Sequence, residues 1–361
     1  MSKLVFAIDT IGSGGAERVM VTLANYMVSK NHTVILVNAD NNEPFFPIDS
    51  RVNVRKMNLN WNNHGRIAMI KRLIKKYKYL KDLYKKEKPD VVLAFLYNME
   101  IPAILAAIRT HTKIVVSVRS SVNYYPKYVQ IFRKLFYPHI KGVVFQSTSV
   151  QQTYPFSKLK NSCVIMNPLT SSITSRMIPV DYHSRNNWII TVGRLMPQKN
   201  QALLIKAFSQ IVDKYPEMEL HIFGEGKLRN ELEQLIIDLT LTNKVFLEGN
   251  VPDAIVKNRN SKLFVMSSDQ EGFPNALVEA MVCGLVSLST KFDTGVAEQL
   301  IEDGVNGFLC EVGNLQDMVN QMIRILDLGE SLQKVSERAA YLYDLVNTEQ
   351  ICNEWERYLL K

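Results

Sequence analysis

Several common sequence signals are missing from this 361-residue chain. No apolar run approaches the roughly 20 residues that a membrane-spanning helix needs. The four cysteines include no Cys-x-x-Cys pair, and the six histidines include no His-x-x-x-His spacing. The first residues turn acidic too early for a signal peptide. We therefore expect a cytoplasmic protein with reduced cysteines, no spanning helix and no zinc site of a common type.

Charge is divided unevenly along the chain. Residues 1–166 hold 25 Lys and Arg against 9 Asp and Glu, whereas residues 167–361 hold 18 against 26. The first half is therefore strongly basic and the second half is acidic. This asymmetry predicts an anionic partner for the first half, namely a phosphorylated substrate, a lipid surface or a nucleic acid.

Short apolar runs alternate with helical patterns, which predicts parallel sheets with crossover helices. In the first half the expected strands are Lys3–Asp9, Thr33–Asn38, Val52–Arg55, Val91–Phe95, Ile114–Val118, Val143–Gln146 and Cys163–Met166. In the second half they are Trp188–Val192, Glu219–Phe223, Val245–Leu247, Leu263–Met266, Val286–Ser289 and Gly307–Leu309. The helices expected there are Gln201–Lys214, Lys227–Leu239, Asn275–Cys283 and Leu315–Leu326, and residues 330–361 look wholly helical.

The fold class expected from this alternation is α/β, with two Rossmann-like parallel-sheet domains. The first spans residues 1–167, a polar linker spans 168–187, and the second spans 188–345. Residues 346–361 form a last helix that we expect to pack back on the first domain. Ligands of such sheets bind at the carboxyl ends of the strands, and a cleft between two domains is the natural site.

A glycine-rich turn follows the first expected strand. Gly14 and Gly15 open a helix, where backbone N–H groups can approach a phosphate or a sugar. Glu17 stands where the third glycine of Gly-x-Gly-x-x-Gly would be. An ordinary tight turn explains this feature equally well.

Two cations follow the strand Trp188–Val192. Arg194 comes directly after Gly193, and Lys199 lies five positions further along. Both side chains suit a diphosphate, whose charge grows as a leaving group departs. A solvated loop is the alternative. Because the chain has no Asp-x-Asp pair to hold Mg²⁺, we expect these cations to act without a metal or another cofactor.

Two carboxylates, Glu271 and Glu279, lie eight positions apart on either side of an expected helix start. Ionised carboxylates accept hydrogen bonds from paired hydroxyls, as in sugars and ribose. The alternative for Glu279 is that it merely complements the helix N-terminus. The residues between them that could face a ligand are Gly272, Phe273, Pro274, Asn275 and Ala276. Gly224 and Glu225 belong to another loop that resembles a nucleotide-facing turn, although an ordinary connection is equally plausible.

Residues 66–88 carry ten Lys and Arg and two acids, and their apolar residues recur at helical spacing. This pattern predicts a basic amphipathic helix, with a solvated surface helix as the alternative. The cations that we expect to bind an acceptor or a membrane surface are Lys71, Arg72, Lys75, Lys76 and Lys78. A second stretch, 124–137, mixes tyrosines, phenylalanines and cations, and a half-buried core explains it equally well.

Taken together, these motifs resemble the family-4 retaining glycosyltransferases of the GT-B fold. The resemblance spans nearly the whole chain and rests on Ser13–Arg18, Asn167-Pro168, Gly193-Arg194-Leu195, Lys199-Asn200, Gly224–Gly226, Gly304–Gly307 and above all Glu271–Glu279. It implies metal-independent transfer of a hexose, with retention, from a nucleotide-sugar. It also implies that Arg194 and Lys199 hold the diphosphate, that Glu279 binds the ribose, and that Glu271 with the amides of Phe273–Asn275 binds the sugar.

The chain departs from the family pattern at two places. Many members have a histidine after the fifth strand, where this chain has Arg119, so Arg119 is expected to take that polar role. The glycine-rich loop near Asp293–Val296 is also reduced. The basic helix resembles the acceptor-side helix of enzymes that extend polyprenyl-diphosphate-linked glycans.

The function expected is therefore a glycosyltransferase of surface polysaccharide or lipid-linked oligosaccharide synthesis, located peripherally at the inner face of the cell membrane. A UDP-sugar is favoured over a GDP-sugar as the donor. A dehydrogenase is disfavoured because Gly-x-Gly-x-x-Gly is missing. A nucleic-acid- or anion-binding protein that uses the basic half is the remaining alternative, and the acidic second half argues against it.

Overall fold

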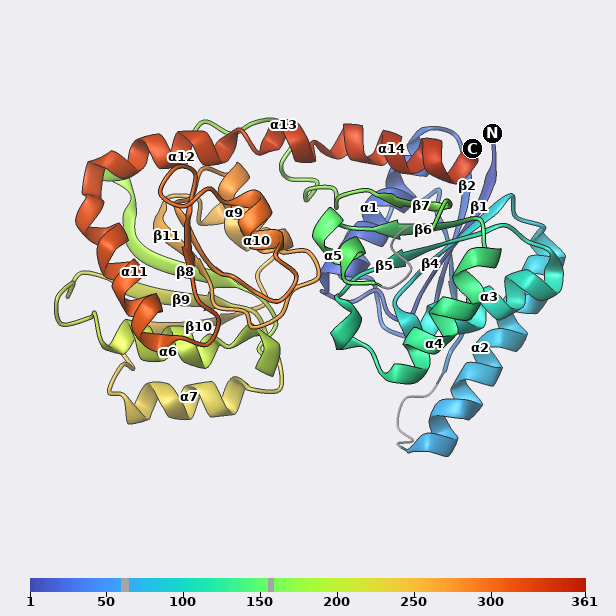
Figure 1. Cartoon of the computed structure of the whole chain (residues 1–361), viewed down its shortest axis with the longest axis horizontal. Coiled ribbons are helices and arrows are strands. Elements are labelled where there is room, and N and C mark those ends of the chain that lie inside the picture. Colours follow the sequence, from blue (N-terminus) through green and yellow to red (C-terminus); the bar gives the residue numbers. More distant parts are fainter. Residues whose placement is uncertain (60–64, 155–158) are drawn as a thin grey trace. The chain divides into compact units, whose positions relative to one another are not determined.

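Parallel strands alternate with helices throughout the computed structural model, which describes residues 1–59, 65–154 and 159–361. The chain divides into two compact units (Figure 1). Unit 1 consists of Met1–Pro168 together with Thr348–Lys361, and unit 2 consists of Leu169–Asn347. The expected α/β class is confirmed in both units.

A seven-stranded sheet forms the centre of unit 1 within the described residues, in the order β3-β2-β1-β4-β5-β6-β7. All neighbouring strands are parallel. The strands are β1 (Lys3–Ile8), β2 (Thr33–Asn38), β3 (Asn53–Lys56), β4 (Val91–Phe95), β5 (Ile114–Val118), β6 (Gly142–Phe145) and β7 (Ser162–Val164). The central strands β1, β4 and β5 are almost wholly buried, as expected for a parallel sheet covered on both faces.

Helices cover both faces of this sheet (Figure 1). They are α1 (Gly15–Ser29), α2 (Arg66–Glu87), α3 (Tyr97–Thr110), α4 (Lys127–Phe136), α5 (Thr148–Gln152) and α14 (Thr348–Leu360), with 3₁₀ turns η1 (Val122–Tyr124) and η2 (Tyr137–His139). The 22-residue α2 is continuous and packs against α3.

Helix α14 belongs to unit 1 although the preceding residues belong to unit 2. The Tyr26 hydroxyl on α1 contacts the Asn353 side chain, and His32 lies 2.9 Å from Glu356. Trp355 is buried and its ring lies 6.0 Å from that of Phe95. The end of the chain therefore completes the core of unit 1.

A six-stranded parallel sheet forms the centre of unit 2 within the described residues, in the order β10-β9-β8-β11-β12-β13. The strands are β8 (Asn186–Val192), β9 (Glu219–Phe223), β10 (Val245–Gly249), β11 (Ser261–Met266), β12 (Ser287–Thr290) and β13 (Phe308–Cys310). The helices are α6 (Gln201–Ser209), α7 (Arg229–Asp238), α8 (Ala254–Lys257), α9 (Asn275–Val282), α10 (Val296–Leu300), α11 (Leu315–Leu328), α12 (Leu332–Ala340) and α13 (Tyr343–Val346), with 3₁₀ turns η3 (Tyr182–Ser184), η4 (Pro197–Lys199) and η5 (Gly329–Ser331).

Two helix predictions in the second half were too long. α6 ends at Ser209 rather than Lys214, because residues 210–214 form turns with bonds such as Lys214 N–H to the Ile211 carbonyl, and Pro216 follows shortly after. Residues 330–361 are not wholly helical. The helices there are interrupted after Ala340 and again at Asn347, whose φ of −51° and ψ of 125° are not helical. None of the helices among the described residues combines the length and apolarity needed to cross a membrane.

Candidate active site

Each sheet has one position where the strand order reverses direction. In unit 1 it lies between β1 and β4, and in unit 2 between β8 and β11. Ligands of open parallel sheets bind beyond the carboxyl ends of the strands at such switch points. In unit 2 the loops that follow β8 and β11 carry Arg194, Lys199 and Glu271. Topology therefore brings the two strongest sequence motifs to one edge of one sheet.

Glycines allow the loop after β8 to pack against the loop after β9. A Cβ atom on Gly224, whose φ is +147°, would lie 2.0 Å from the Gly193 carbonyl oxygen. A Cβ on Gly226 would lie 2.2 Å from the Leu195 carbonyl oxygen. The Leu195 amide also donates to the Glu225 carbonyl at 3.0 Å. This packing gives the Gly-x-Gly pair a structural role, whether or not the loop also faces a ligand.

Lys199 and Glu271 contact each other directly. The Lys199 ammonium group donates to a carboxylate oxygen of Glu271, and the Ser268 hydroxyl donates to the same oxygen at 2.7 Å. The side chains of Lys199 and Glu271 are only 20% and 9% exposed. The Thr294 hydroxyl holds the Glu271 carbonyl at 3.0 Å. The sequence analysis gave this cation and this carboxylate separate ligand groups, whereas the structure joins them in one cluster.

Hydrogen bonds from neighbouring residues fix the backbone on both sides of this pair. Asn200, in the left-handed region with φ of 45°, donates through its side chain to Asp269 at 2.9 Å. Its oxygen accepts from the Leu203 amide at 3.3 Å and so caps α6. The Ser267 hydroxyl donates to the Lys199 carbonyl at 3.0 Å. The cluster is therefore held by the loops that follow both strands.

Arg194 differs from Lys199 in its surroundings. Its side chain is exposed, and it has no hydrogen bond or ion pair with any other residue that the structure describes. Its carbonyl accepts from the Gln201 side chain at 3.0 Å, which holds the backbone. Arg194 is thus a solvent-exposed cation five positions before Lys199 in the same loop, and its guanidinium group is available to a ligand.

The start of α9 gives a mixed result for the expected sugar-binding amides. Pro274 stands at the N-cap position without a side-chain cap, so the first turn of α9 has amides that the helix itself does not use. The Asn275 amide, however, donates to the Phe273 carbonyl at 3.0 Å. The Phe273 side chain is buried, whereas Gly272 and Ala276 are half-buried.

The two other carboxylates expected near the donor lie in different environments. Glu279 is buried one turn inside α9. Burial, followed by the charge of Glu279, raises the pKa of Cys283 to about 12. Glu225 is half-exposed and pairs with Arg229 at 2.5 Å, a local contact four residues along the chain. Glu279 is therefore the better placed of the two for a ligand that excludes water.

In unit 1 the glycine turn after β1 contacts an acidic side chain. The Glu17 carboxylate lies directly against Gly14, because a Cβ at that position would come within 2.2 Å of a carboxylate oxygen. A side chain at position 14 would therefore require the Glu17 carboxylate to move, and Gly15 begins α1. A phosphate at this turn would meet the negative charge of Glu17, so the geometry favours a neutral hydroxyl-bearing group or the tight-turn alternative here.

Arg119 follows β5 and is buried, with 7% of its surface exposed. One guanidinium nitrogen donates to the Asn167 side chain at 2.6 Å, and the group stacks over the Phe95 ring at 3.8 Å. Two further nitrogens, Nε and Nη2, have no hydrogen-bond partner among the described residues. Burial lowers the pKa of Arg119, partly offset by Tyr125 and Glu17. A buried guanidinium with unused donors can donate hydrogen bonds to an anion or to another polar group that accepts them.

The basic helix α2 has two distinct parts. The N-terminal turns expose Ile67, Ile70 and Ile74, whereas Leu80 and Tyr84 further along are buried. The cations that are exposed or half-buried are Lys71, Arg72, Lys75 and Lys78. Lys76 is buried, and its ammonium group lies 2.5 Å from Asp9 at the end of β1. The helical pattern predicted five cations on the surface. This prediction is wrong for Lys76, which is buried.

The aromatic stretch 124–137 also divides between core and surface. Tyr137 and Arg133 are buried, and Arg133 makes a two-bond ion pair with Glu100 at 3.0 and 2.7 Å. Tyr124 and Tyr128 are each about half-exposed. The structure therefore agrees with the alternative given for this stretch, namely that it forms part of a half-buried core.

Sequence reasoning missed Ser268, Thr294 and Asn167 as members of these clusters. Ser268 lies three positions before Glu271 and directly beyond β11, so its place at a strand's carboxyl end was the available signal. Asn167 was noted only as part of a boundary dipeptide. Nothing in the sequence pairs Asn167 with Arg119, which lies 48 positions away.

Two protein-family models match the chain. The one described as Glycosyltransferase Family 4 matches residues 13–158, and the one described as Glycosyl transferases group 1 matches residues 180–341. The first covers most of unit 1 and the second most of unit 2.

Full-length relatives have similar sequences. An uncharacterised glycosyltransferase of Haemophilus influenzae is 26% identical, over 99% of this chain and 100% of that protein. A Campylobacter jejuni enzyme, named N-acetylgalactosamine-N,N'-diacetylbacillosaminyl-diphospho-undecaprenol 4-alpha-N-acetylgalactosaminyltransferase, is 27% identical over 100% of both chains. Another C. jejuni alpha-1,4-N-acetyl-D-galactosaminyltransferase is 28% identical, over 99% of this chain and 95% of that one.

Solved structures have the same fold. HepE of Anabaena, in complex with UDP and glucose, matches with a TM-score of 0.79 and 19% identity, covering 99% of each chain. Sucrose-phosphate synthase of Thermosynechococcus elongatus matches with a TM-score of 0.84 and 15% identity, covering 99% of this chain and 98% of that one. With both family models, two parallel-sheet units and the paired motifs in agreement, the chain belongs to the family-4 glycosyltransferases and has the GT-B fold.

Proposed function

We propose that this glycosyltransferase moves a sugar, with retention and without a metal, from a UDP-sugar to a polyprenyl-diphosphate-linked glycan. The observation that carries the proposal is the cluster of Lys199, Glu271 and Ser268 at the switch point of the second sheet. A cation and a carboxylate at one sheet edge offer binding groups for both halves of a nucleotide-sugar. The diphosphate takes the cation, and hydroxyl groups take the carboxylate.

The donor is bound mainly by residues of unit 2. Arg194, exposed and unpaired within the described chain, and Lys199 together bind the diphosphate. Glu279 accepts hydrogen bonds from the ribose hydroxyls, and Glu271 accepts from hydroxyls of the sugar. A UDP-sugar is favoured because the HepE structures contain UDP and UDP-glucose. In unit 1, Arg119 and the Gly14–Gly15 turn offer other polar groups that a ligand could contact.

The transfer needs no nucleophile from the protein. The acceptor hydroxyl oxygen forms a bond to the anomeric carbon as the bond from that carbon to the diphosphate oxygen breaks. The electron pair of the broken bond leaves with the diphosphate, and the hydroxyl proton passes to one of its phosphate oxygens. Fixed positive charge from Arg194 and Lys199 stabilises the charge that develops on the leaving group, which is why a metal ion is not required in this scheme.

The acceptor is proposed from the relatives and from α2. Both C. jejuni relatives are named for glycan acceptors linked to undecaprenol through a diphosphate. The exposed cations Lys71, Lys75 and Lys78 offer binding groups for such a diphosphate. Ile67, Ile70 and Ile74, which are 72%, 52% and 48% exposed, lie on the same helix and suit the apolar part of a bilayer surface. We propose a peripheral location at the inner membrane face on this basis.

Transfer to a defined acceptor tests this function. The full-length enzyme is incubated in EDTA with a panel of UDP-sugars and a polyprenyl-diphosphate-linked oligosaccharide, and the product is analysed by mass spectrometry and NMR. We expect one UDP-sugar to add mass equal to a sugar residue and to keep its anomeric configuration. An inverted linkage would disprove retention, and a product formed only with added Mg²⁺ or Mn²⁺ would disprove the metal-free scheme.

A further inference from the structure

A pocket lies in unit 1, at the edge of the sheet opposite to the glycine turn and Arg119. It is formed by the end of α3, the segments that lead into β5 and β6, and the end of α4 with η2. The glycine turn and Arg119 follow the carboxyl ends of β1 and β5, whereas Lys113 and Lys141 precede the amino ends of β5 and β6. The pocket is therefore separate from the residues proposed to bind the donor.

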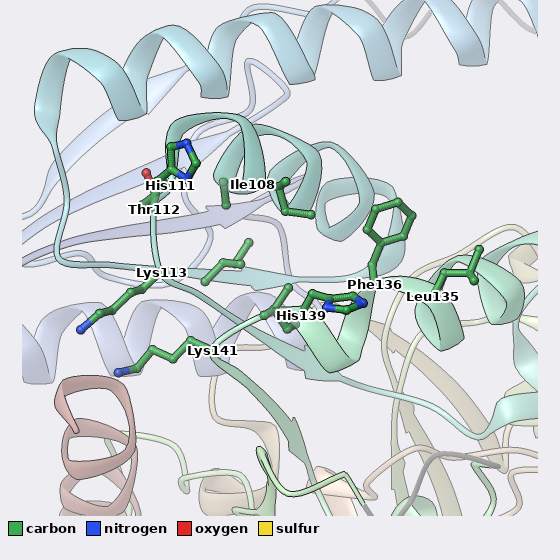
Figure 2. A pocket seen from close by; sticks show the side chains of 11 residues that line it. Ile108, His111, Thr112, Lys113, Leu135, Phe136, His139 and Lys141 are labelled. Atoms are coloured by element: carbon green, nitrogen blue, oxygen red, sulfur yellow. The ribbon is translucent and has the colours of Figure 1, made fainter.

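One end of this pocket is basic. Lys113 and Lys141 lie at this end, whereas His111 and His139 line other parts of the pocket (Figure 2). No acidic side chain is among the lining residues. Figure 2 shows Lys113 and Lys141 extending in the same direction from neighbouring strands. None of the four side chains makes an ion pair or a hydrogen bond with another residue in the described parts of the chain.

Two lysines placed together without a carboxylate repel each other. Burial, followed by the charge of Lys113, lowers the pKa of Lys141. An anion bound between the two ammonium groups would remove this repulsion and restore the pKa. Charge-assisted hydrogen bonds from Lys to phosphate oxygens are the strong interactions that such a pair can form.

The other end of the pocket is apolar. Ile108 and Leu135 line it and are 43% and 60% exposed, and Phe136 lies beside them (Figure 2). Ile140, which is buried, also lines the pocket. A ligand that fills both ends has an anionic group at one end and an apolar group at the other.

We propose that this pocket binds a phosphate ester that carries an apolar group, at a site distinct from the donor and acceptor sites of glycosyl transfer. The phosphate lies between Lys113 and Lys141. The apolar group lies against Ile108, Leu135 and Phe136. The shared chemistry belongs equally to a soluble ester and to a phospholipid headgroup.

Calorimetry on the full-length protein tests the pocket with hexyl phosphate and with its two halves, inorganic phosphate and hexanol. We expect saturable binding of hexyl phosphate, about tenfold tighter than that of inorganic phosphate, because only the ester reaches both ends. Lys113→Ala combined with Lys141→Ala should weaken hexyl phosphate binding by about tenfold or more. Leu135→Ser should weaken the ester and leave inorganic phosphate unchanged.

The matched control is Lys206→Ala, which removes an exposed lysine from α6 of unit 2 and should leave binding unchanged. Thermal melting of each variant checks that it is folded. Co-sedimentation with phosphatidylcholine vesicles containing phosphatidic acid identifies the source. If the double lysine variant loses vesicle sedimentation, the ligand is a lipid. If it loses only the binding of hexyl phosphate, the ligand is a soluble ester. Absence of saturable binding, equal affinity for inorganic phosphate, or an unchanged double variant would overturn the proposal.

Discussion

The Lys199 ammonium group contacts the Glu271 carboxylate across 72 positions of sequence, and Ser268 holds the same carboxylate oxygen. This pair links the two motifs that define the site. To bind a diphosphate, the Lys199 ammonium group must either contact Glu271 and a phosphate oxygen together or leave Glu271 for the phosphate. If Lys199 binds the diphosphate as proposed, Glu271 both orients Lys199 and limits its affinity for a free nucleotide. The following experiment separates these two effects.

Charge removal at the two glutamates should have opposite effects on nucleotide binding. Glu279→Gln removes a hydroxyl acceptor from a buried position and should weaken UDP binding by about 1.5–3 kcal/mol, the range for hydrogen bonds to charged groups. Glu271→Gln releases Lys199 from its carboxylate, so UDP should bind equally or more tightly while turnover falls. Calorimetry with UDP and a turnover assay measure the two effects. Equal weakening of UDP binding by both changes would contradict these roles.

Neutralising the exposed cations of α2 should affect the acceptor and the membrane but not the donor. The variant Lys71→Ala, Lys75→Ala and Lys78→Ala should lose about 1 kcal/mol per cation in binding to anionic vesicles at low salt, and its apparent KM for a lipid-diphosphate acceptor should rise. Vesicle sedimentation and acceptor kinetics measure this. Donor hydrolysis by the same variant serves as the control and should persist. Wild-type vesicle binding and acceptor kinetics would mean that α2 is only a solvated surface.

Lys76 should behave differently from its neighbours on α2. Its pairing with Asp9 at 2.5 Å is buried, so Lys76→Met leaves a carboxylate without its cation and should destabilise the protein by about 3–5 kcal/mol. Lys75→Met, one position earlier and exposed, is the matched control and should change stability by less than about 0.5 kcal/mol. Urea unfolding compares the two. Similar small effects would show that the buried pair contributes little.

Arg119 should be more important for activity than for stability. It is buried, and among the residues that the structure describes it has two unused donors and no carboxylate in hydrogen-bond contact, an arrangement that costs folding free energy. Arg119→Met should therefore leave the free energy of unfolding within about 1 kcal/mol of wild type, or raise it, while turnover falls by about tenfold or more. Unfolding curves and transfer assays on the same preparation measure both quantities. A destabilised variant that keeps wild-type turnover would make Arg119 a structural residue.

The sequence predicted the sheets well because parallel strands are apolar along their whole length. Val91–Phe95 and Ile114–Val118 were predicted with their correct ends, since both are buried on each side and a polar residue precedes each. The same logic located Lys199 and Glu271 correctly at the ends of strands. The sequence could not predict that Lys199 and Glu271 contact each other, because this contact depends on β8 and β11 being neighbours in the sheet.

Other features depend on tertiary contacts that a periodic pattern does not encode. A helical pattern treats every lysine on a basic face as solvated, so it could not separate Lys76, buried against Asp9, from Lys75. Likewise, the break at Asn347 arises where the chain passes from one unit to the other. The position of Glu17 against Gly14 is also invisible in the sequence, although it decides which ligand groups that turn can accept.

The central claim is that Lys199, in contact with Glu271, binds the donor's diphosphate without a metal. Release of the nucleoside diphosphate from a panel of UDP- and GDP-sugars, measured in EDTA for the wild type and for Lys199→Ala, tests it most directly. We expect release from at least one UDP-sugar by the wild type, and a loss of about 2–4 kcal/mol of transition-state stabilisation in the variant. Release that requires added Mg²⁺ or Mn²⁺, or that is equal in the variant, would contradict it.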